Sequence, residues 1–194
     1  MDAENGKRIL IVRDYVMKNM KDLPYHNFKH AEDVARVSRE LAIKEGINSE
    51  GIFLLETAGY IHDIISEVGR KDNEERSIER GEYFLPTMGY TPSQVYRVKS
   101  LVMATKLPTN PKNLLERIIC DADLDNLGRE DFFEKNEALR QEFGITDKKS
   151  WYQDSVNFLE GHNYYTRAAR RYRGQMKSYN LAQLKQRITK YENS

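Results

Sequence analysis

The sequence has very little cysteine and no long apolar run, and each absence excludes a class of protein. Its 194 residues include a single cysteine, Cys120, which excludes an internal disulfide and a metal cage built from thiolates. This cysteine usage suits a reducing cytosol, so we expect a cytoplasmic protein. The N-terminal segment is polar and acidic, and no apolar run approaches the ~18 residues that a membrane-spanning helix requires. No membrane partner is expected.

The sequence also lacks an excess of charge of either sign. Its 31 basic residues oppose 30 acidic residues, which gives a formal net charge of +1 at pH 7. No overall field therefore favours nucleic acid as a partner. The segment 163–173 mixes basic and aromatic residues that could stack on bases and contact phosphates. We favour a simpler interpretation, a packed helix with its tyrosines inward and its arginines in water.

The hydrophobic pattern predicts an all-α protein. Apolar residues recur at spacings of three and four, with no strand-like alternation, no internal repeat and no low-complexity tract. The expected helices cover residues 7–20, 27–45, 49–62, 74–89, 91–104, 111–127, 130–143, 149–162, 163–173 and 179–191. Gly144, Gly161 and Gly174 are expected to break the helical pattern after residue 130. The length of 194 residues fits a single domain, residues 1–194, with or without an extension.

Two of the four histidines are expected to point into the core. On a helix that begins near Asn27, His30 shares one face with three apolar residues, Val34, Val37 and Leu41. On the next helix, His62 follows Leu55, Ala58 and Gly59 at helical spacings. Asp63 adds a carboxylate beside the second imidazole. Together these groups are typical metal ligands, although either histidine alone is explained more simply as a core imidazole bonded to a backbone carbonyl.

A further acid is available in the segment Asp121-Ala122-Asp123-Leu124-Asp125. At about 100° per residue, Asp123 lies about 200° from Asp121 around a helix, so the two cannot both face one ion. The apolar residues of this helix do not decide between them. From periodicity alone, either aspartate could complete the site.

These motifs carry a family resemblance. Tyr-His-Asn-x-x-His at 25–30, His-Asp at 62–63 and a later aspartate resemble the signature of the HD-domain metal-dependent phosphohydrolase superfamily, over about residues 20–130. The first segment is similar to that of the cyclic-nucleotide phosphodiesterases. The resemblance implies an HD-domain helical bundle, followed by a helical C-terminal extension at about 130–194. It also implies metal ligation by His30, His62, Asp63 and Asp123, because Ala122-Asp123 matches the family's common Ala-Asp step.

The scarcity of histidine favours one metal ion rather than two. Beyond the signature, only His162 remains, whereas binuclear relatives use additional histidines. Many small members of the superfamily have a histidine where this chain has Asn73, which weakens a two-metal interpretation further. Two imidazoles and two carboxylates suit Mn, Fe, Co, Ni, Zn or Mg as a divalent ion, and the sequence does not choose among them.

The resemblance further implies a reaction. It is hydrolysis of a phosphomonoester or phosphodiester, of a nucleotide or another small phosphorylated metabolite, by attack of metal-bound hydroxide. Asp63, or the aspartate from the 121–125 segment, is expected to orient the water. His26 is expected to protonate the leaving oxygen, as the matching histidine of the phosphodiesterases does. Lys106, Arg76 and Lys29 are the candidates to hold the phosphate charge.

Two alternatives stay open at this point. The first is a hydrolase of a signalling nucleotide, such as guanosine tetraphosphate or a cyclic nucleotide, although the longer modules of the large synthetase-hydrolases are missing. The second is a regulatory module that binds a metal or nucleotide without turnover. An oligomer is compatible with either. The motifs indicate a reaction class and do not name a substrate.

Overall fold

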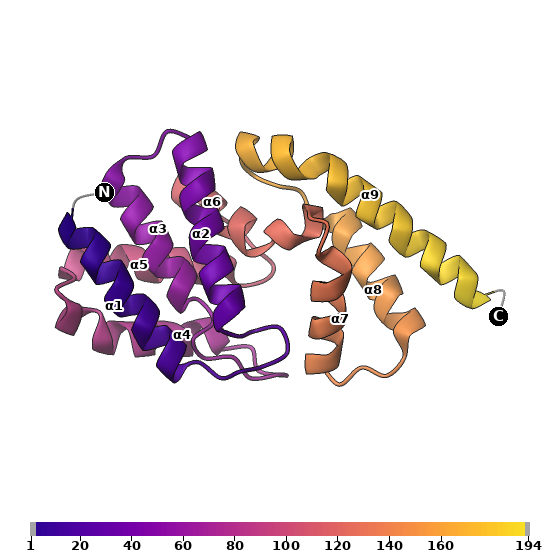
Figure 1. Ribbon diagram of the computed structural model, residues 1–194, viewed down its shortest axis with the longest axis horizontal. Helices are drawn as coiled ribbons and strands as arrows, with labels where there is room; N and C mark the ends of the chain where they lie inside the picture. The colour runs from indigo at the N-terminus through magenta and orange to yellow at the C-terminus, as the bar shows by residue number, and fades with distance from the viewer. Residues whose placement is uncertain (1–2, 193–194) are drawn as a thin grey trace.

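Helices joined by loops make up the protein (Figure 1). The computed structural model describes residues 3–192, and no β-strand occurs within them, so the all-α prediction is confirmed. The helices are α1 (Ala3–Asn19), α2 (Phe28–Lys44), α3 (Ser49–Ile61), α4 (Asn73–Phe84), α5 (Pro92–Thr105), α6 (Leu114–Asp123), α7 (Phe132–Glu142), α8 (Lys148–Gly161) and α9 (Arg167–Glu192). Two short 3₁₀ segments are η1 (Pro86–Met88) and η2 (Asp125–Gly128).

The larger hydrophobic core lies among the first six helices. α2 and α3 pack against each other, α1 and α5 lie against α3, and α6 contacts α2, α3 and α5. The buried residues of this core include Val34, Phe53, Leu54, Leu55 and Ile118. Their helical spacing places them on one face of each helix, and burying these faces is what drives the helices together.

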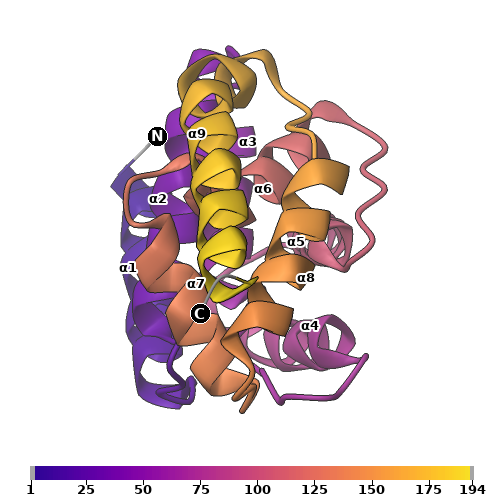
Figure 2. The ribbon, with the colours of Figure 1, turned by 90° about the vertical axis from the view of Figure 1, so that its right-hand side faces the viewer.

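A second, smaller core lies among α7, α8 and α9. It is built around Phe132, Trp151, Leu159 and Leu184, each at most 8% exposed. α9 connects the two cores, because Ala169 near its start packs in the larger core and Leu184 packs in the smaller one. Figure 2 shows α9 running beside α8, with which it packs.

The predicted break at Gly174 is wrong, because α9 continues through this residue without interruption. One glycine costs a helix interior only about 1 kcal/mol, and packing against both cores offsets that cost. A different glycine, Gly128, allows α9 to pass close to η2. A Cβ at Gly128 would lie 2.5 Å from the carbonyl oxygen of Arg173.

Two predicted helices are shorter than expected. The helix expected over 111–127 begins at Leu114 and ends at Asp123, where the chain tightens into η2. The helix expected to end near Gly89 stops at Phe84 and is followed by η1. In both cases a 3₁₀ turn extends the helical pattern of the sequence beyond the α-helix itself.

The segment 163–173 only partly fits the packed-helix interpretation. Tyr164 is buried, as expected, but Tyr172 is 52% exposed. Arg170 donates to the backbone carbonyl oxygens of Tyr164 and Tyr165, and Arg173 forms an ion pair with buried Asp125. Part of the basic character of this segment is therefore used inside the molecule.

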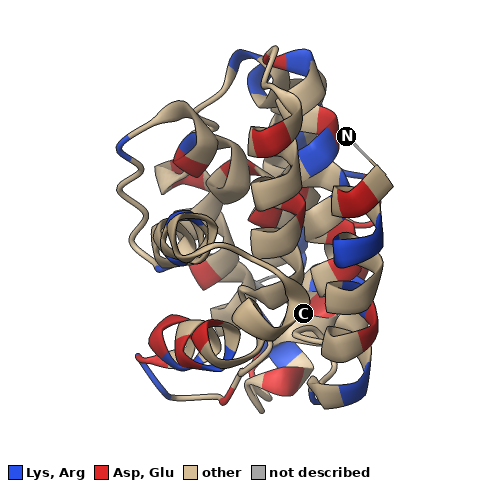
Figure 3. Cartoon of the chain, turned by 90° about the vertical axis from the view of Figure 1, so that its left-hand side faces the viewer, with Lys and Arg blue, Asp and Glu red and all other residues tan. Residues whose placement is uncertain are grey.

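Charged residues of both signs are mixed along the helices on the side of the molecule that Figure 3 shows. Many form pairs within one helical turn, such as Arg36 with Asp33 and Glu40. This mixture agrees with the near-neutral net charge. None of the helices within residues 3–192 is both long and apolar enough to cross a bilayer.

Candidate active site

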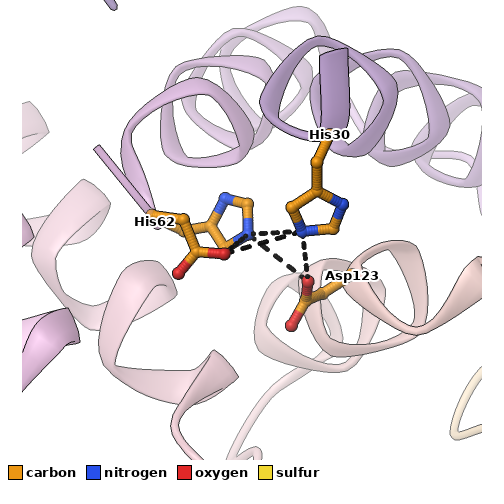
Figure 4. Close-up of side chains that lie close together, drawn as sticks. His30, His62 and Asp123 are labelled. Atoms are coloured by element: carbon orange, nitrogen blue, oxygen red, sulfur yellow. Dashed lines mark hydrogen bonds and ion pairs between the residues drawn. The ribbon is translucent and has the colours of Figure 1, made fainter. Parts of the chain in front are cut away.

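Four potential metal ligands meet where α2, α3 and α6 converge. His30 lies on α2, His62 and Asp63 follow the last residue of α3, and Asp123 is the last residue of α6. Each offers one ligand atom, and these four atoms all lie within 4.8 Å of one another. Figure 4 shows His30, His62 and Asp123 pointing toward one another. The structure thus brings together the four residues that the sequence singled out as ligands.

The start of α2 fixes the place of His30. Asn27 is the N-cap, and its Oδ1 accepts hydrogen bonds from the backbone N–H groups of Lys29 and His30 at 3.0 and 3.2 Å. This cap satisfies two donors that a helix start otherwise leaves unpaired. His30 is 6% exposed and belongs to the buried face of α2. The inward orientation predicted from its apolar stripe is observed.

A close approach of α3 to α2 brings the second histidine near the first. A Cβ on Gly59 would lie only 2.6 Å from the Cα of Ala35, so any larger residue would push the helices apart. Three residues later, Nδ1 of His62 lies 2.8 Å from the Gly59 carbonyl oxygen. A carbonyl can only accept, so Nδ1 carries the proton. The other ring nitrogen, Nε2, therefore faces the cluster as a potential ligand.

The donor atoms are close enough to require a positive charge among them. Nε2 of His62 lies 3.0 Å from Oδ2 of Asp63 and 3.3 Å from Oδ1 of Asp123. Nε2 of His30 lies 3.2 Å from that same Asp123 oxygen and 3.3 Å from Nε2 of His62. Two imidazole lone pairs facing each other repel unless a proton or a metal cation lies between them. The arrangement therefore fits a cation.

Electrostatics support the same conclusion. Burial lowers the pKa of His62, but Asp63 and Asp123 outweigh it and raise this pKa well above the usual range. Burial raises the pKa of Asp63, but His62 and His26 hold it well below its usual value. The pKa of Asp123 is about 2, because hydrogen bonds from His30 and His62 outweigh burial. Both acids are ionised at neutral pH, so protons and metal compete for the same atoms.

His26 lies at the edge of the cluster. It precedes the N-cap of α2, and its Nε2 is 3.7 Å from Oδ2 of Asp63. Its Nδ1 is 2.5 Å from Oε1 of Glu142, the last residue of α7. The other oxygen of Glu142 accepts the backbone N–H groups of Tyr25 and His26 at 2.8 and 2.9 Å. One carboxylate from the C-terminal helices thus fixes the orientation of this imidazole.

Glu142 was missed by the sequence analysis. It lies 116 residues from His26, and its side chain is only 1% exposed. Nothing in the charged pattern of 130–143 separates it from the other acids of that helix. Burial lowers the pKa of His26, but Asp63 and Glu142 outweigh it, so the pKa is raised. The imidazole is therefore more readily protonated near neutral pH than an ordinary histidine.

Asp121, the alternative to Asp123, serves another purpose. Its carboxylate accepts the backbone N–H groups of Tyr165 and Thr166 at 2.8 and 2.7 Å. The residue is fully buried, and burial raises its pKa to about 6 despite these bonds. Asp121 therefore attaches the start of α9 to α6, on the opposite side of the helix from the cluster.

The three predicted phosphate-binding cations do not gather at the cluster. Arg76 forms an ion pair with Glu67 at 3.0 Å, and Lys106 forms one with Glu75. Lys29 is exposed at the start of α2. None of the three lines the cavity that adjoins the cluster, whereas Lys135 of α7 does. No ion pair of Lys135 is found within residues 3–192.

A cavity of about 370 Å³ adjoins the cluster and separates the two cores. His26, Asp63 and Asp123 line it on the side of the first six helices. The opposite walls are mostly apolar side chains of η2, α7 and α8, including Leu127, Phe132, Leu139, Phe143, Trp151 and Phe158. Its size and its apolar walls with few polar groups are typical of a small-molecule site.

The fold is that of solved HD-domain structures, so the fold that the resemblance predicted is confirmed. Bacillus subtilis YpgQ, solved in complex with ADP, matches with a TM-score of 0.73 and 20% identity over 96% of both chains. A Lactobacillus plantarum protein matches with a TM-score of 0.77 and 14% identity, over 97% of this chain and 98% of its own.

A third solved structure carries the family name. It is a predicted HD superfamily hydrolase from an uncultured Thermotogales bacterium, with a TM-score of 0.60 and 18% identity over 95% of this chain and 92% of that one. No protein-family model and no curated protein matches the sequence. At these identities the likeness establishes the fold, and the chemistry has to be argued from the site itself.

Proposed function

We propose that the protein is a metal-dependent phosphohydrolase that cleaves a phosphomonoester or phosphodiester of a small molecule. The observation that carries this proposal is the meeting of two imidazole nitrogens and two carboxylate oxygens within 4.8 Å, beside a cavity and a third histidine. A core with only structural histidines would not need two ionised carboxylates against two facing imidazole nitrogens. The solved structure of a predicted HD superfamily hydrolase with the same fold supports the assignment.

The donor set fits one divalent ion held by His30, His62, Asp63 and Asp123. His62 already donates its Nδ1 hydrogen to a backbone carbonyl, which is the tautomer that leaves Nε2 free for a metal. A bound divalent ion would polarise a phosphoryl oxygen and lower the pKa of water at the site. Nitrogen and oxygen donors without sulfur leave the choice among Mn, Fe, Co, Ni, Zn and Mg open.

His26 is the proton donor of this proposal. Glu142 holds its Nδ1, so its Nε2 faces the cluster and the cavity. With a raised pKa, the imidazolium is available to protonate the leaving oxygen of the ester as the P–O bond breaks. Asp63 belongs to the cluster and lines the cavity, so it would orient an attacking water by accepting one of its hydrogens.

A nucleotide is the substrate class that we favour. YpgQ, which shares the fold over nearly its full length, was solved with ADP. The cavity next to the cluster offers aromatic walls and one cation, Lys135. Stacking and charge attraction are the interactions that a base and a phosphate require.

The test uses purified protein loaded with each metal in turn and a panel of phosphate esters. We expect one equivalent of metal by elemental analysis and hydrolysis of at least one phosphate ester. His30→Ala should lose both the metal and the activity. His162→Ala is the matched control, because His162 lies between α8 and α9 and is not among the cluster residues. Activity that survives His30→Ala, or a full panel without turnover by metal-loaded protein, would refute the proposal.

A further inference from the structure

The cavity beside the cluster has polar residues whose hydrogen bonds are mostly satisfied. Nε1 of Trp151 donates to Oδ1 of Asn136 at 2.7 Å, and Nδ2 of Asn136 donates to Oγ of Ser155 at 2.8 Å. The Ser155 hydroxyl donates to the backbone carbonyl of Trp151 at 2.8 Å, which closes the network. These groups hold the indole of Trp151 in the cavity wall and have little hydrogen-bonding capacity left for a ligand.

Asn126 of η2 is the exception. Asn126 is among the residues that line the cavity, and its buried Oδ1 has no hydrogen-bond partner within residues 3–192. An unpaired buried carbonyl costs folding free energy, on the order of 1–3 kcal/mol, and such groups are rare in native proteins. Since no group within residues 3–192 donates to this oxygen, a bound molecule that supplies a donor would remove that cost.

The position of Asn126 indicates which part of a ligand it would meet. It lies three residues after Asp123, on the turn that leads away from the cluster toward the apolar walls. A phosphate bound at the cluster would therefore place its organic substituent between Asn126 and the aromatic side chains of α7 and α8. Phe132 and Trp151 belong to these walls, and Trp151 is held by the network described above.

We propose that the cavity binds the heterocyclic ring of the substrate, a nucleobase, and that the amide of Asn126 pairs with the edge of that ring. An amide presents a donor and an acceptor side by side, and so does a nucleobase edge. A flat ring also gains stacking against aromatic walls. An alkyl substituent would fill the apolar space but leave the Asn126 oxygen unpaired. The position of the phosphate rests on the proposed function, whereas ring binding does not.

Paired substrates with and without a nucleobase provide the kinetic test. With metal-loaded protein, we expect kcat/KM for at least one nucleoside mono- or triphosphate to exceed that for ribose 5-phosphate and inorganic tripolyphosphate by more than about tenfold. Asn126→Leu keeps the volume and removes the amide, so it should reduce this preference by about tenfold or more. Asn157→Leu, an exposed position on α8 outside the cavity lining, should leave the preference unchanged.

Fluorescence gives a second readout that requires neither metal nor turnover. Trp151 is the only tryptophan in the chain, so the signal reports on the cavity wall alone. Titration with the four common ribonucleosides should change it in wild-type protein and in Asn157→Leu, and much less in Asn126→Leu. Because the amide oxygen has no partner, Asn126→Leu should melt at or above the wild-type temperature, which would show that the variant is folded.

The outcomes separate the two proposals. Nucleoside binding that depends on Asn126, in a protein that hydrolyses no phosphate ester, would keep the ring site and refute the hydrolase. Equal hydrolysis of substrates with and without a nucleobase, with no fluorescence change, would overturn the ring site and keep the hydrolase. If Asn126→Leu showed the same preference for nucleotides and the same change in Trp151 fluorescence as the wild type, the role of Asn126 would be overturned.

Discussion

The two halves of the molecule contribute different things to the site. The first six helices supply every member of the His30, His62, Asp63 and Asp123 cluster. α7 and α8 supply none of these donors, but they form the apolar walls of the cavity, and α7 carries the carboxylate of Glu142 that holds His26. The candidate ion site is therefore built on one core, whereas residues from both halves line the cavity beside it.

The largest expected effect separates two neighbouring aspartates of α6, of which Asp123 belongs to the cluster and Asp121 bonds to the start of α9. Asp123→Asn removes a donor of the cluster, so we expect loss of stoichiometric metal and at least about a 100-fold loss of activity. Asp121→Asn removes a charge that accepts two backbone N–H groups from the start of α9. We expect that variant to keep its metal and to lose about 1–3 kcal/mol of unfolding free energy.

Elemental analysis and thermal unfolding of the two variants, side by side, check this contrast. Each variant is the control for the other, since both remove one buried or half-buried carboxylate from α6. Loss of metal from Asp121→Asn with retention in Asp123→Asn would reverse the assignment of the two residues.

Glu142→Gln tests whether the C-terminal helices take part in the chemistry. Gln can still bond to the backbone but carries no charge, so the pKa of His26 should fall toward its usual value. We expect kcat to drop by about 10- to 100-fold and the alkaline limb of the pH profile to move to lower pH, because less of His26 is protonated. The metal content should not change, since Glu142 is outside the cluster.

Glu137→Gln is the matched control for this change, since Glu137 lies on α7 and pairs with Arg140 rather than with His26. It should leave the pH profile in place. A Glu142→Gln enzyme with a wild-type pH profile would show that His26 needs no carboxylate from α7.

The ionised cluster should also appear in the pH dependence of stability. The pKa of Asp123 is lowered to about 2, so its contribution is present above the unfolded value near 3.9 and is lost as pH falls through about 2. The pKa of His62 is raised, so its contribution is complete below about 6.5 and is lost as pH rises through the folded value. Both contributions are fully present only between about pH 4 and 6.5.

We therefore expect metal-free wild type to exceed metal-free Asp123→Asn in unfolding free energy by about 2 kcal/mol in that window, and by less at higher pH. Added metal replaces the proton, so its stabilising effect on the wild type should grow from pH 6 to pH 8. Denaturant unfolding at several pH values, with and without metal, measures both trends. If the difference in unfolding free energy between metal-free wild type and metal-free Asp123→Asn increased above pH 7, the pairing of Asp123 with His62 would be contradicted.

The sequence predicted the part of the site that short-range patterns control. His30 and His62 were found because each shares a helix face with apolar residues. The predicted helices agree with the structure in class and order, except that those expected over 163–173 and 179–191 form the single helix α9. Periodicity left the choice between Asp121 and Asp123 open, and the family resemblance favoured Asp123. Periodicity could not decide because the choice depends on α6 ending at Asp123 and on the backbone of residues 165 and 166 meeting Asp121.

Contacts between residues far apart along the chain could not be predicted from the sequence. Glu142 meets His26 across 116 residues, and no local pattern encodes such a pairing. Lys106 and Arg76 were chosen for their charge, but acids on neighbouring elements pair with both. That Oδ1 of Asn126 has no hydrogen-bond partner within residues 3–192 can be observed only in three dimensions.

The smallest expected effect concerns the helix that joins the two halves. Gly174 lies inside α9 with nothing within 4 Å of a Cβ, so Gly174→Ala should raise the unfolding free energy by about 0.5–1 kcal/mol. Gly6→Ala is the matched control in α1, where a Cβ also meets nothing within 4 Å. If both variants gain stability in denaturant unfolding, α9 is one continuous helix that couples the cores. If Gly174→Ala alone loses stability, the helix is interrupted there and the halves are joined less rigidly.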